Sequence, residues 1–403
     1  MRSDPRQSEA SHNLRRMYLL ALVVFISSLS HRIAGPVLPA LSRELGATKA
    51  AMIFILASQV MTIVVLQFFM GLLADRLGRK RVMLAGITLG SLTSVGCALA
   101  AGWNTLLAFR IGGGIADCMA AMATFGMTAE LSRGKTGTFF GILRASSGLS
   151  WLFGPILGGW VSLVSFRAPF WTDAALSGFA ALLVATVVTE VEPSSEDEAH
   201  SLSVFKHLGV VFSDRVVWMA ALFGISEIFA YSILSASVPM KVDDLGAPPW
   251  VLSFVLVGQG TAFSVTSFFC GRAADRVGKK PFFVVAELLL LAACLGLSFS
   301  GIVLGTGLWY FIFGLGAGTV YTLSFALATD RIGRRFLATS LAAFDTVIDL
   351  SFLVGPPLAA VAMKISGTMT VTFWLALLPA LISLPLALSM SREASLPHSD
   401  RGA

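Results

Sequence analysis

The sequence has few charged residues and few cysteines. Only 13% of its 403 residues are charged, against 56% that are hydrophobic, whereas a soluble domain carries about 25% charged residues. This composition excludes an ordinary cytosolic enzyme, a disordered protein and a secreted disulfide scaffold. The cysteines lie in apolar segments without ligand-like spacing, so we interpret them as small buried hydrophobic residues and not as disulfides or metal ligands. They are Cys97, Cys118, Cys270 and Cys294.

The sequence also lacks the motifs of catalysis and of nucleotide binding. It contains no G-x-x-x-x-G-K-[ST], no H-E-x-x-H and no G-x-S-x-G, and its five histidines are scattered. We therefore expect no ATP-driven pump, no enzyme, no cofactor and no metal site. No loop is long enough to hold a soluble domain, which also argues against a transporter-like sensor that signals without moving solute.

Apolar segments of roughly 20 residues, the length that a helix needs to cross a bilayer, recur along the whole chain. They are too long and too uniformly apolar for barrel strands, which alternate. We interpret the first as a retained helix and not as a signal peptide. The prediction is an all-α membrane protein with twelve transmembrane helices: 17–38, 51–73, 82–101, 105–129, 137–163, 168–188, 214–238, 250–271, 282–300, 306–328, 337–363 and 368–389.

Lysine and arginine are distributed unevenly between the two predicted sides of the membrane. The odd-numbered loops carry five of them, whereas the other side, tails included, carries 21. The positive-inside rule then places both termini in the cytoplasm of a bacterial cell, with the chain crossing the inner membrane many times. The net charge of +6 is thus interpreted as a topological signal and not as a nucleic-acid-binding surface.

The two halves of the chain repeat one another. GLLADRLGRK at 71–80 matches GRAADRVGKK at 271–280, an offset of 200 residues. Later matches have an offset of 201, as for Gly154 and Gly355. Such a repeat predicts two pseudo-symmetric six-helix bundles, which transporters use to build a central site. The predicted division is a cytoplasmic tail 1–16, a bundle 17–188, a cytoplasmic linker 189–213, a bundle 214–389 and a cytoplasmic tail 390–403.

The segment 71–80 strongly resembles the signature of the major facilitator superfamily, G-x-L-a-D-R-x-G-R-[KR], and length, span count and repeat extend the resemblance to the whole chain. It implies the major facilitator fold and a cytoplasmic gate; the alternative is a topology anchor only. We expect Gly71 to allow close helix approach, Gly78 to permit a tight turn, Asp75 to meet a helix N-terminus of the other half, and Arg79 to pair with Glu130. The implied gate residues are Gly71, Asp75, Arg76, Gly78, Arg79, Lys80, Glu130, Gly271, Asp275, Arg276, Gly278, Lys279 and Lys280.

Spans 4 and 5 resemble motifs of the antiporter branch of this family. In span 4, Arg110 and Gly114 fit R-x-x-x-G, although Gly113 stands where a polar residue is usual. Span 5 fits G-x8-G-x3-G-P-x2-G-G, whose small residues let helices slide or rock and whose proline bends the helix. This resemblance favours efflux over uptake. The span-5 residues are Gly141, Ser150 in place of a glycine, Gly154, Pro155, Gly158 and Gly159.

Charged residues inside a bilayer are costly and indicate functional sites. Spans 1, 4, 7 and 10 line the central cavity in this family. Related exporters often have an acid in span 1, so Arg32 favours an anionic substrate unless it reaches the interface. The repeat places Asp345 opposite Arg144, which predicts either a proton site or a structural ion pair. The candidate substrate-binding and proton-coupling residues are His31, Arg32, Gln59, Arg110, Asp117, Arg144, Glu227, Gln259, Asp345 and Asp349.

The sequence therefore predicts a secondary active transporter that resembles the twelve-span drug:proton antiporters. By alternating access it would couple proton movement to the efflux of a drug or small amphipathic metabolite, including an anionic one, and so confer multidrug resistance. The alternative is a proton-coupled uptake symporter for an organic anion, sugar or other metabolite. The expected partners are the substrate, protons and the lipid bilayer, with no nucleic acid, and a monomer suffices.

Overall fold

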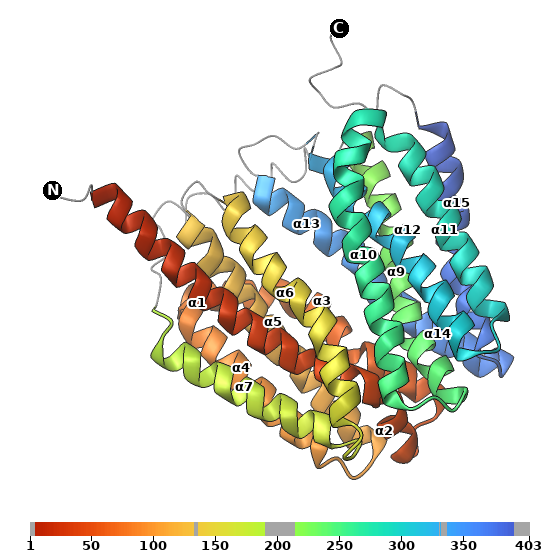
Figure 1. The fold of residues 1–403 in the computed structure, drawn as a ribbon, viewed down its shortest axis with the longest axis horizontal. Coiled ribbons are helices and arrows are strands. Elements are labelled where there is room, and N and C mark those ends of the chain that lie inside the picture. Colours follow the sequence, from red (N-terminus) through yellow and green to blue (C-terminus); the bar gives the residue numbers. More distant parts are fainter. Residues whose placement is uncertain (1–4, 133–135, 190–213, 330, 332–336, 391–403) are drawn as a thin grey trace, which may run out of the picture. The chain divides into compact units, whose positions relative to one another are not determined.

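The computed structural model describes residues 5–132, 136–189, 214–329, 331 and 337–390, and this part of the chain is helical with no strand (Figure 1). The all-α prediction is thus confirmed for it. The elements are α1 Pro5–Ile33, η1 Gly35–Val37, α2 Leu38–Glu44, α3 Lys49–Leu77, α4 Arg79–Ala98, α5 Trp103–Ser132, α6 Thr136–Val161, α7 Ala168–Thr186, α9 Arg215–Asp244, α10 Pro249–Val277, α11 Lys279–Phe299, α12 Val303–Thr329, α13 Leu337–Asp349, α14 Ser351–Ser366 and α15 Thr370–Ser389.

The long helices agree with the predicted spans. Within the described residues, eleven helical segments are long and apolar enough to cross a membrane. Helix α6, with 26 residues, stands at the place of the predicted fifth span and completes a set of twelve. Several helices run beyond the predicted ends, because apolar patterning marks the bilayer core while the helix continues to the next glycine or proline.

Two predicted spans are interrupted. The first changes at Ala34 into the short 3-10 turn η1 and then α2, whose starts contain Pro36 and Pro39. The eleventh, predicted as one helix over 337–363, is broken at Leu350 into α13 and α14. Leu350 keeps helical backbone angles, φ −54° and ψ −21°, and its carbonyl accepts from the Leu353 amide at 2.9 Å, so the break is one tighter turn with the three-residue spacing of a 3-10 helix.

The chain divides into two compact units, residues 1–47 with 58–195, and residues 48–57 with 196–403. In the first unit α1 packs against α6 and α7, and α4 against α5 and α7. In the second, α12 packs against α9, α10 and α11, and α15 against α9 and α11. The predicted linker lies, except for Thr189, outside the described residues.

Each unit has its own apolar core. In the first, Met17 of α1, Met83 of α4 and Met127 of α5 are buried in one cluster. In the second, Phe223 of α9 stacks on Phe283 of α11 with ring centroids 4.2 Å apart. The four cysteines are also buried and free, as the sequence predicted. These contacts hold the helices that carry the site described below.

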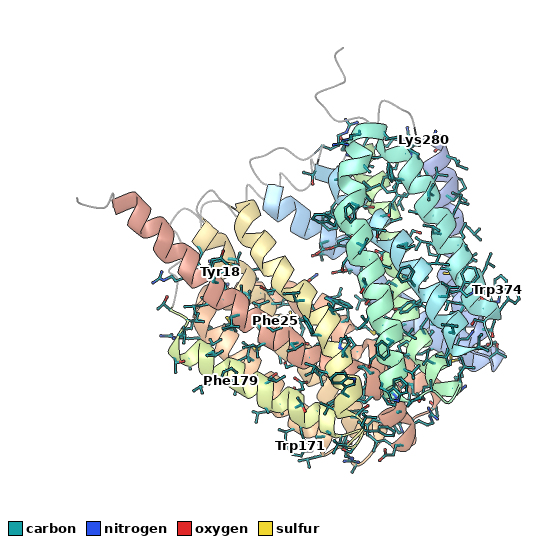
Figure 2. The ribbon with its side chains drawn as sticks, in the orientation of Figure 1. Tyr18, Phe25, Trp171, Phe179, Lys280 and Trp374 are labelled. Atoms are coloured by element: carbon teal, nitrogen blue, oxygen red, sulfur yellow. The ribbon has the colours of Figure 1, made fainter. Side chains whose placement is uncertain are left out.

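Large apolar side chains also cover the outer surface. Figure 2 shows Trp171 and Phe179 of α7 and Trp374 of α15 pointing away from the helices, and 42–50% of each of these side chains is exposed. In water such a surface would be unfavourable, whereas lipid accommodates it. The exterior therefore fits the predicted bilayer.

Candidate transport site

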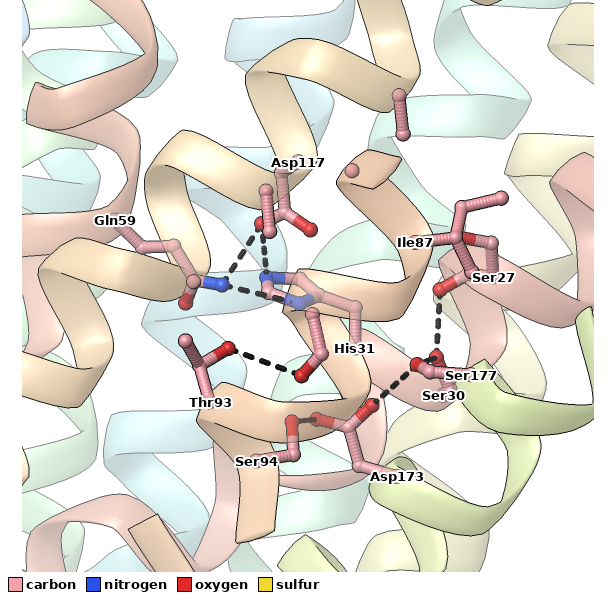
Figure 3. Close-up of a pocket in the computed structure, with 15 residues that line it drawn as sticks. Ser27, Ser30, His31, Gln59, Ile87, Thr93, Ser94, Asp117, Asp173 and Ser177 are labelled. Atoms are coloured by element: carbon pink, nitrogen blue, oxygen red, sulfur yellow. Dashed lines mark hydrogen bonds and ion pairs between the residues drawn. The ribbon is translucent and has the colours of Figure 1, made fainter. Parts of the chain in front are cut away.

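Three helices of the first unit bring His31, Gln59 and Asp117 together (Figure 3). The His31 Nε2 atom lies 3.2 Å from Asp117 Oδ2. The Gln59 amide nitrogen donates to Asp117 Oδ2 at 2.8 Å and lies 3.1 Å from His31 Nδ1. The sequence singled out each of these residues separately, and the fold unites them in one cluster on α1, α3 and α5.

The hydrogen bonds in this cluster define one arrangement of protons. The amide nitrogen of Gln59 can only donate, so Nδ1 of a neutral His31 accepts from it and the ring proton lies on Nε2. That proton points at Asp117. The side chains of His31 and Asp117 remain 32% and 29% exposed. An imidazole and a carboxylate in contact form a unit that can take up one further proton without leaving an unpaired charge in the membrane.

Two adjacent glycines of α5 make room for the cluster. A Cβ on Gly114 would lie 2.7 Å from the backbone oxygen of Gln59, so only glycine allows α3 to approach so closely. A Cβ on Gly113 would lie 3.1 Å from the Gln59 amide nitrogen. The missing side chain at Gly113, which departs from the family pattern, therefore leaves the space that Gln59 occupies.

A second polar group lies in the same bundle around Asp173 of α7, which is 6% exposed. Ser94 of α4 donates to its Oδ2 at 2.6 Å, and Ser177 donates to its Oδ1 at 3.1 Å. Ser30 of α1 lies 2.9 Å from the Ser177 hydroxyl. The sequence analysis overlooked Asp173, although the signal was present, since it is a carboxylate inside the predicted span 168–188.

Residues of both groups line one small cavity of about 20 Å³, which has room for a water molecule. Its wall is unusually polar for the interior of a membrane helix bundle, with hydroxyl, amide, imidazole and carboxylate groups from five helices. The polar residues in the wall are Ser27, Ser30, His31, Gln59, Thr93, Ser94, Asp117, Asp173 and Ser177.

Two arginines lie near these polar groups in the same bundle. Arg110 of α5 interacts electrostatically with His31, Asp117 and Asp173. The Arg32 guanidinium carbon lies 3.3 Å from the ring centroid of Trp151 on α6, a cation–π contact. Arg32 therefore packs on an aromatic face inside the bundle, whereas a side chain that reaches for the membrane interface would extend away from it.

The candidates of the second unit lie on three helices, α9, α10 and α13. Glu227 of α9 is 1% exposed, and its Oε2 atom has no hydrogen-bond partner in the described part of the chain. Tyr321 of α12 donates to Asp345 at 3.3 Å, and Asp349 ends α13 at the break. Gln259 is buried. The side chain of Arg144 lies outside the described residues, so its pairing with Asp345 stays a prediction.

The segment 71–80 agrees with its predicted role in part. Gly78 has φ +94° and its repeat partner Gly278 has φ +95°, which confirms the tight turns. A Cβ on Gly71 would meet no atom of the described residues within 4 Å, so the close helix approach expected there stays a prediction. Arg79 is buried, and its Nη1 atom donates to the Gly126 carbonyl at 2.7 Å. The side chains of Asp75, Asp275 and Glu130 lie outside the described residues.

Stability measurements separate the two glycines of this segment. We expect Gly78→Ala to destabilise the protein by about 1–3 kcal/mol, because a side chain at this φ strains the backbone. Gly71→Ala lies in a helix with open space around it and is expected to be neutral or stabilising by up to about 1 kcal/mol. Thermal unfolding of the two purified variants checks this, and equal melting temperatures would contradict the assigned turn.

The predicted small-residue motif of span 5 packs α6 tightly on α1. A Cβ on Gly154 would lie 2.5 Å from Arg32 Cβ, and one on Gly158 would lie 2.0 Å from the Ile33 carbonyl oxygen. Ser150, which replaces a glycine of the motif, donates to the Phe25 carbonyl at 3.1 Å. These contacts support the physical interpretation of the motif as a close helix–helix interface.

Known bacterial proteins are similar to this chain in sequence. The Quinolone resistance protein NorA of Staphylococcus aureus is 25% identical over 252 residues, which are 61% of this chain and 63% of NorA, less than two thirds of its length. The uncharacterized MFS-type transporter YdgK of Bacillus subtilis is 23% identical over 79% of this chain and 82% of its own.

The fold likeness extends further than the sequence likeness. The crystal structure of a bacterial homolog of the human lysosomal transporter Spinster, in an inward-facing and occupied conformation, superimposes with a TM-score of 0.75 at 12% identity. It covers 98% of this chain and all of the other. The sequence also matches the Major Facilitator Superfamily model over residues 20–348 and again over 221–402. The chain therefore belongs to the Major Facilitator Superfamily.

Proposed function

We propose that this protein is a proton-coupled exporter of drugs or small amphipathic compounds in a bacterial inner membrane. The observation that carries the proposal is the cluster of His31, Gln59 and Asp117 within membrane-crossing helices. A transporter that uses a proton gradient needs a group that gains and loses a proton inside the membrane. This pair of imidazole and carboxylate, held in one geometry by Gln59, meets that need.

Two further observations support export. NorA, which shares a quarter of the aligned residues, is named for quinolone resistance. The tight contact of α6 with α1 is built by the residues that resemble the antiporter motif, Gly154 and Gly158. Gly154 packs on Arg32 and Gly158 packs on Ile33, and both of these residues lie on α1. Movement of α6 against α1 would therefore act on the helix that also carries His31. We therefore infer that α6 links substrate movement to the proton site during alternating access.

The contact between Arg32 and Trp151 supports a substrate that carries a negative charge beside an aromatic or apolar body. The Arg32 guanidinium lies over the indole of Trp151, and a guanidinium is the side chain best suited to bind a carboxylate through two parallel donors. Trp151 is 38% exposed and offers an apolar surface next to this charge. An amphipathic organic anion matches both groups.

Everted membrane vesicles test the proposed function. Vesicles are energised, cationic, neutral and anionic amphipathic compounds are added in turn, and a pH-sensitive dye follows the proton gradient. We expect one or more compounds to dissipate the gradient in vesicles with the wild-type protein and not in vesicles without it. Accumulation of a solute by intact cells, with no response in vesicles, would instead show an uptake symporter.

The same vesicles test the role of Arg32. We expect Arg32→Gln to weaken the response to anionic compounds by about tenfold, the effect of losing roughly 1.4 kcal/mol of binding, with neutral compounds unaffected. Arg43→Gln is the matched control, because Arg43 is exposed at the end of α2. An equal loss for anionic and neutral compounds would show that Arg32 serves the fold and not specificity.

A further inference from the structure

Asp173 lies closer to one end of the bundle than the His31–Asp117 pair does. Helices α5 and α7 begin at the same end, since Arg167, just before α7, donates to the Ala98 carbonyl at the end of α4. Asp173 is five residues beyond Ala168, the start of α7, a depth of about 8 Å at roughly 1.5 Å per residue. Asp117 is fourteen residues beyond Trp103, or about 21 Å deep.

One cavity is lined by residues at both of these depths. Both carboxylates line it, and so does Gln59, whose amide oxygen has no hydrogen-bond partner among the described residues although Gln59 is only 4% exposed. A buried acceptor of this kind is normally satisfied by a donor, and water is the donor that fits a small polar cavity. A water in the cavity, which Asp173 and Asp117 both line, would supply this donor.

The charges around Asp173 favour proton exchange with this pair. From α1, His31 acts on Asp173, and from α5 both Asp117 and Arg110 do so. From α4, the Cys97 thiol interacts electrostatically with Asp173, and the Ser94 hydroxyl donates a hydrogen bond to its carboxylate. Among the described residues of α6 no charged group acts on it. Protonation of His31 or Asp117 therefore changes the electrostatic energy of the Asp173 carboxylate, and protonation of Asp173 changes that of the pair.

We propose that Asp173 is a proton-relay residue. It passes protons between the end of the bundle at which α5 and α7 begin and the His31–Asp117 pair, through water in the cavity. Its carboxylate takes a proton from a hydronium ion at the end where α5 and α7 begin, which forms an O–H bond and leaves a neutral water. That bond breaks as the proton moves to a cavity water, which gives another proton to the Asp117 carboxylate. One proton is transferred in total, and water is the sole co-reactant. The positive-inside prediction makes this end the periplasmic one, from which protons enter.

The relay rests on the proposed proton coupling, but its first test needs neither substrate nor transport. Purified full-length protein without substrate is acidified, and infrared difference spectra record the C=O band of each protonated carboxylic acid. We expect separate bands that are lost in Asp173→Asn and in Asp117→Asn. Glu44→Gln, which changes an exposed carboxylate at the end of α2, is the control and leaves both bands in place.

A rate measurement then tests whether protons reach Asp117 through Asp173. After a rapid acid jump, protonation of Asp117 is expected to be roughly tenfold slower in Asp173→Asn than in the wild type, an added barrier of about 1.4 kcal/mol. Asp173→Glu should restore most of the rate, which a purely structural role would not predict. Ser177→Ala, which removes one donor, should shift the Asp173 band and serves in place of Asp173→Asn where that variant does not fold.

The outcomes separate the relay from the proposed function. An unchanged set of bands in Asp173→Asn, or an unchanged rate of Asp117 protonation, would overturn the relay. If proton-driven export is present in vesicles while both spectroscopic tests fail, only the relay is wrong. If the Asp173 band titrates but no compound moves with protons, the proposed export is wrong and Asp173 remains a buried proton-binding group.

Discussion

Replacing Asp117 by asparagine is expected to abolish proton-coupled transport while the protein stays folded. Asparagine has nearly the same size, and its side-chain oxygen can still accept from the Gln59 amide and from His31 Nε2. What it cannot do is exchange a proton. We expect the proton flux that accompanies substrate movement to fall by about a hundredfold or more, the usual loss when a proton-transferring group is removed.

The measurement is the dye response of everted vesicles, with thermal unfolding recorded in parallel to show that the variant is intact. Glu44→Gln, which removes an exposed carboxylate at the end of α2, should behave like the wild type. Asp117→Glu keeps the acid but displaces it and is expected to retain part of the activity. Full coupling in Asp117→Asn would move the proton site elsewhere, with Glu227 of α9 as the next buried acid to test.

Adding one methyl group at Gly158 is expected to destabilise the first bundle strongly. A Cβ there would lie 2.0 Å from the Ile33 carbonyl oxygen, and a backbone atom of a membrane helix cannot rotate out of the way. α6 and α1 would have to separate, and overpacking of this kind costs about 1–3 kcal/mol or more. Because His31 lies two residues before Ile33, proton coupling should fall together with stability.

Helix α6 also provides the matched control. Gly148 has no atom within 4 Å of the place where a Cβ would be, and we expect Gly148→Ala to gain up to about 1 kcal/mol from higher helix propensity. Thermal unfolding of the two variants side by side makes the comparison. Similar melting temperatures would show that α1 and α6 are not in contact at Gly158, and that the span-5 motif does not build this interface.

Much of the fold was predictable from the sequence. A bilayer accepts only segments whose backbone groups are all paired, so runs of about 20 apolar residues identify helices directly. The glycine turns at Gly78 and Gly278 were also predictable, since few other residues adopt a positive φ. The break at Leu350 was not, because it is a single tighter turn in a segment that is apolar throughout, and hydropathy does not mark such a turn.

The candidate site divides in the same way. The cost of a charge in the membrane marks His31, Asp117 and Glu227 as exceptional in the sequence alone. It does not say which of them meet. The repeat predicts that Asp345 pairs with Arg144, which stays a prediction because the Arg144 side chain lies outside the described residues, while Tyr321 donates to Asp345. The repeat relates positions in the chain and does not determine which side chains touch.

The sequence by itself therefore determined the membrane class, the helices and the family, because these depend on local hydropathy and on motifs of neighbouring residues. Only the tertiary structure decided that His31, Gln59 and Asp117 form one unit, and that Asp173 lies beside a cavity that leads to them. These residues come from four helices far apart in the chain. Their distances depend on how closely the helices pack, which glycines such as Gly114 and Gly158 set through the atoms they leave out.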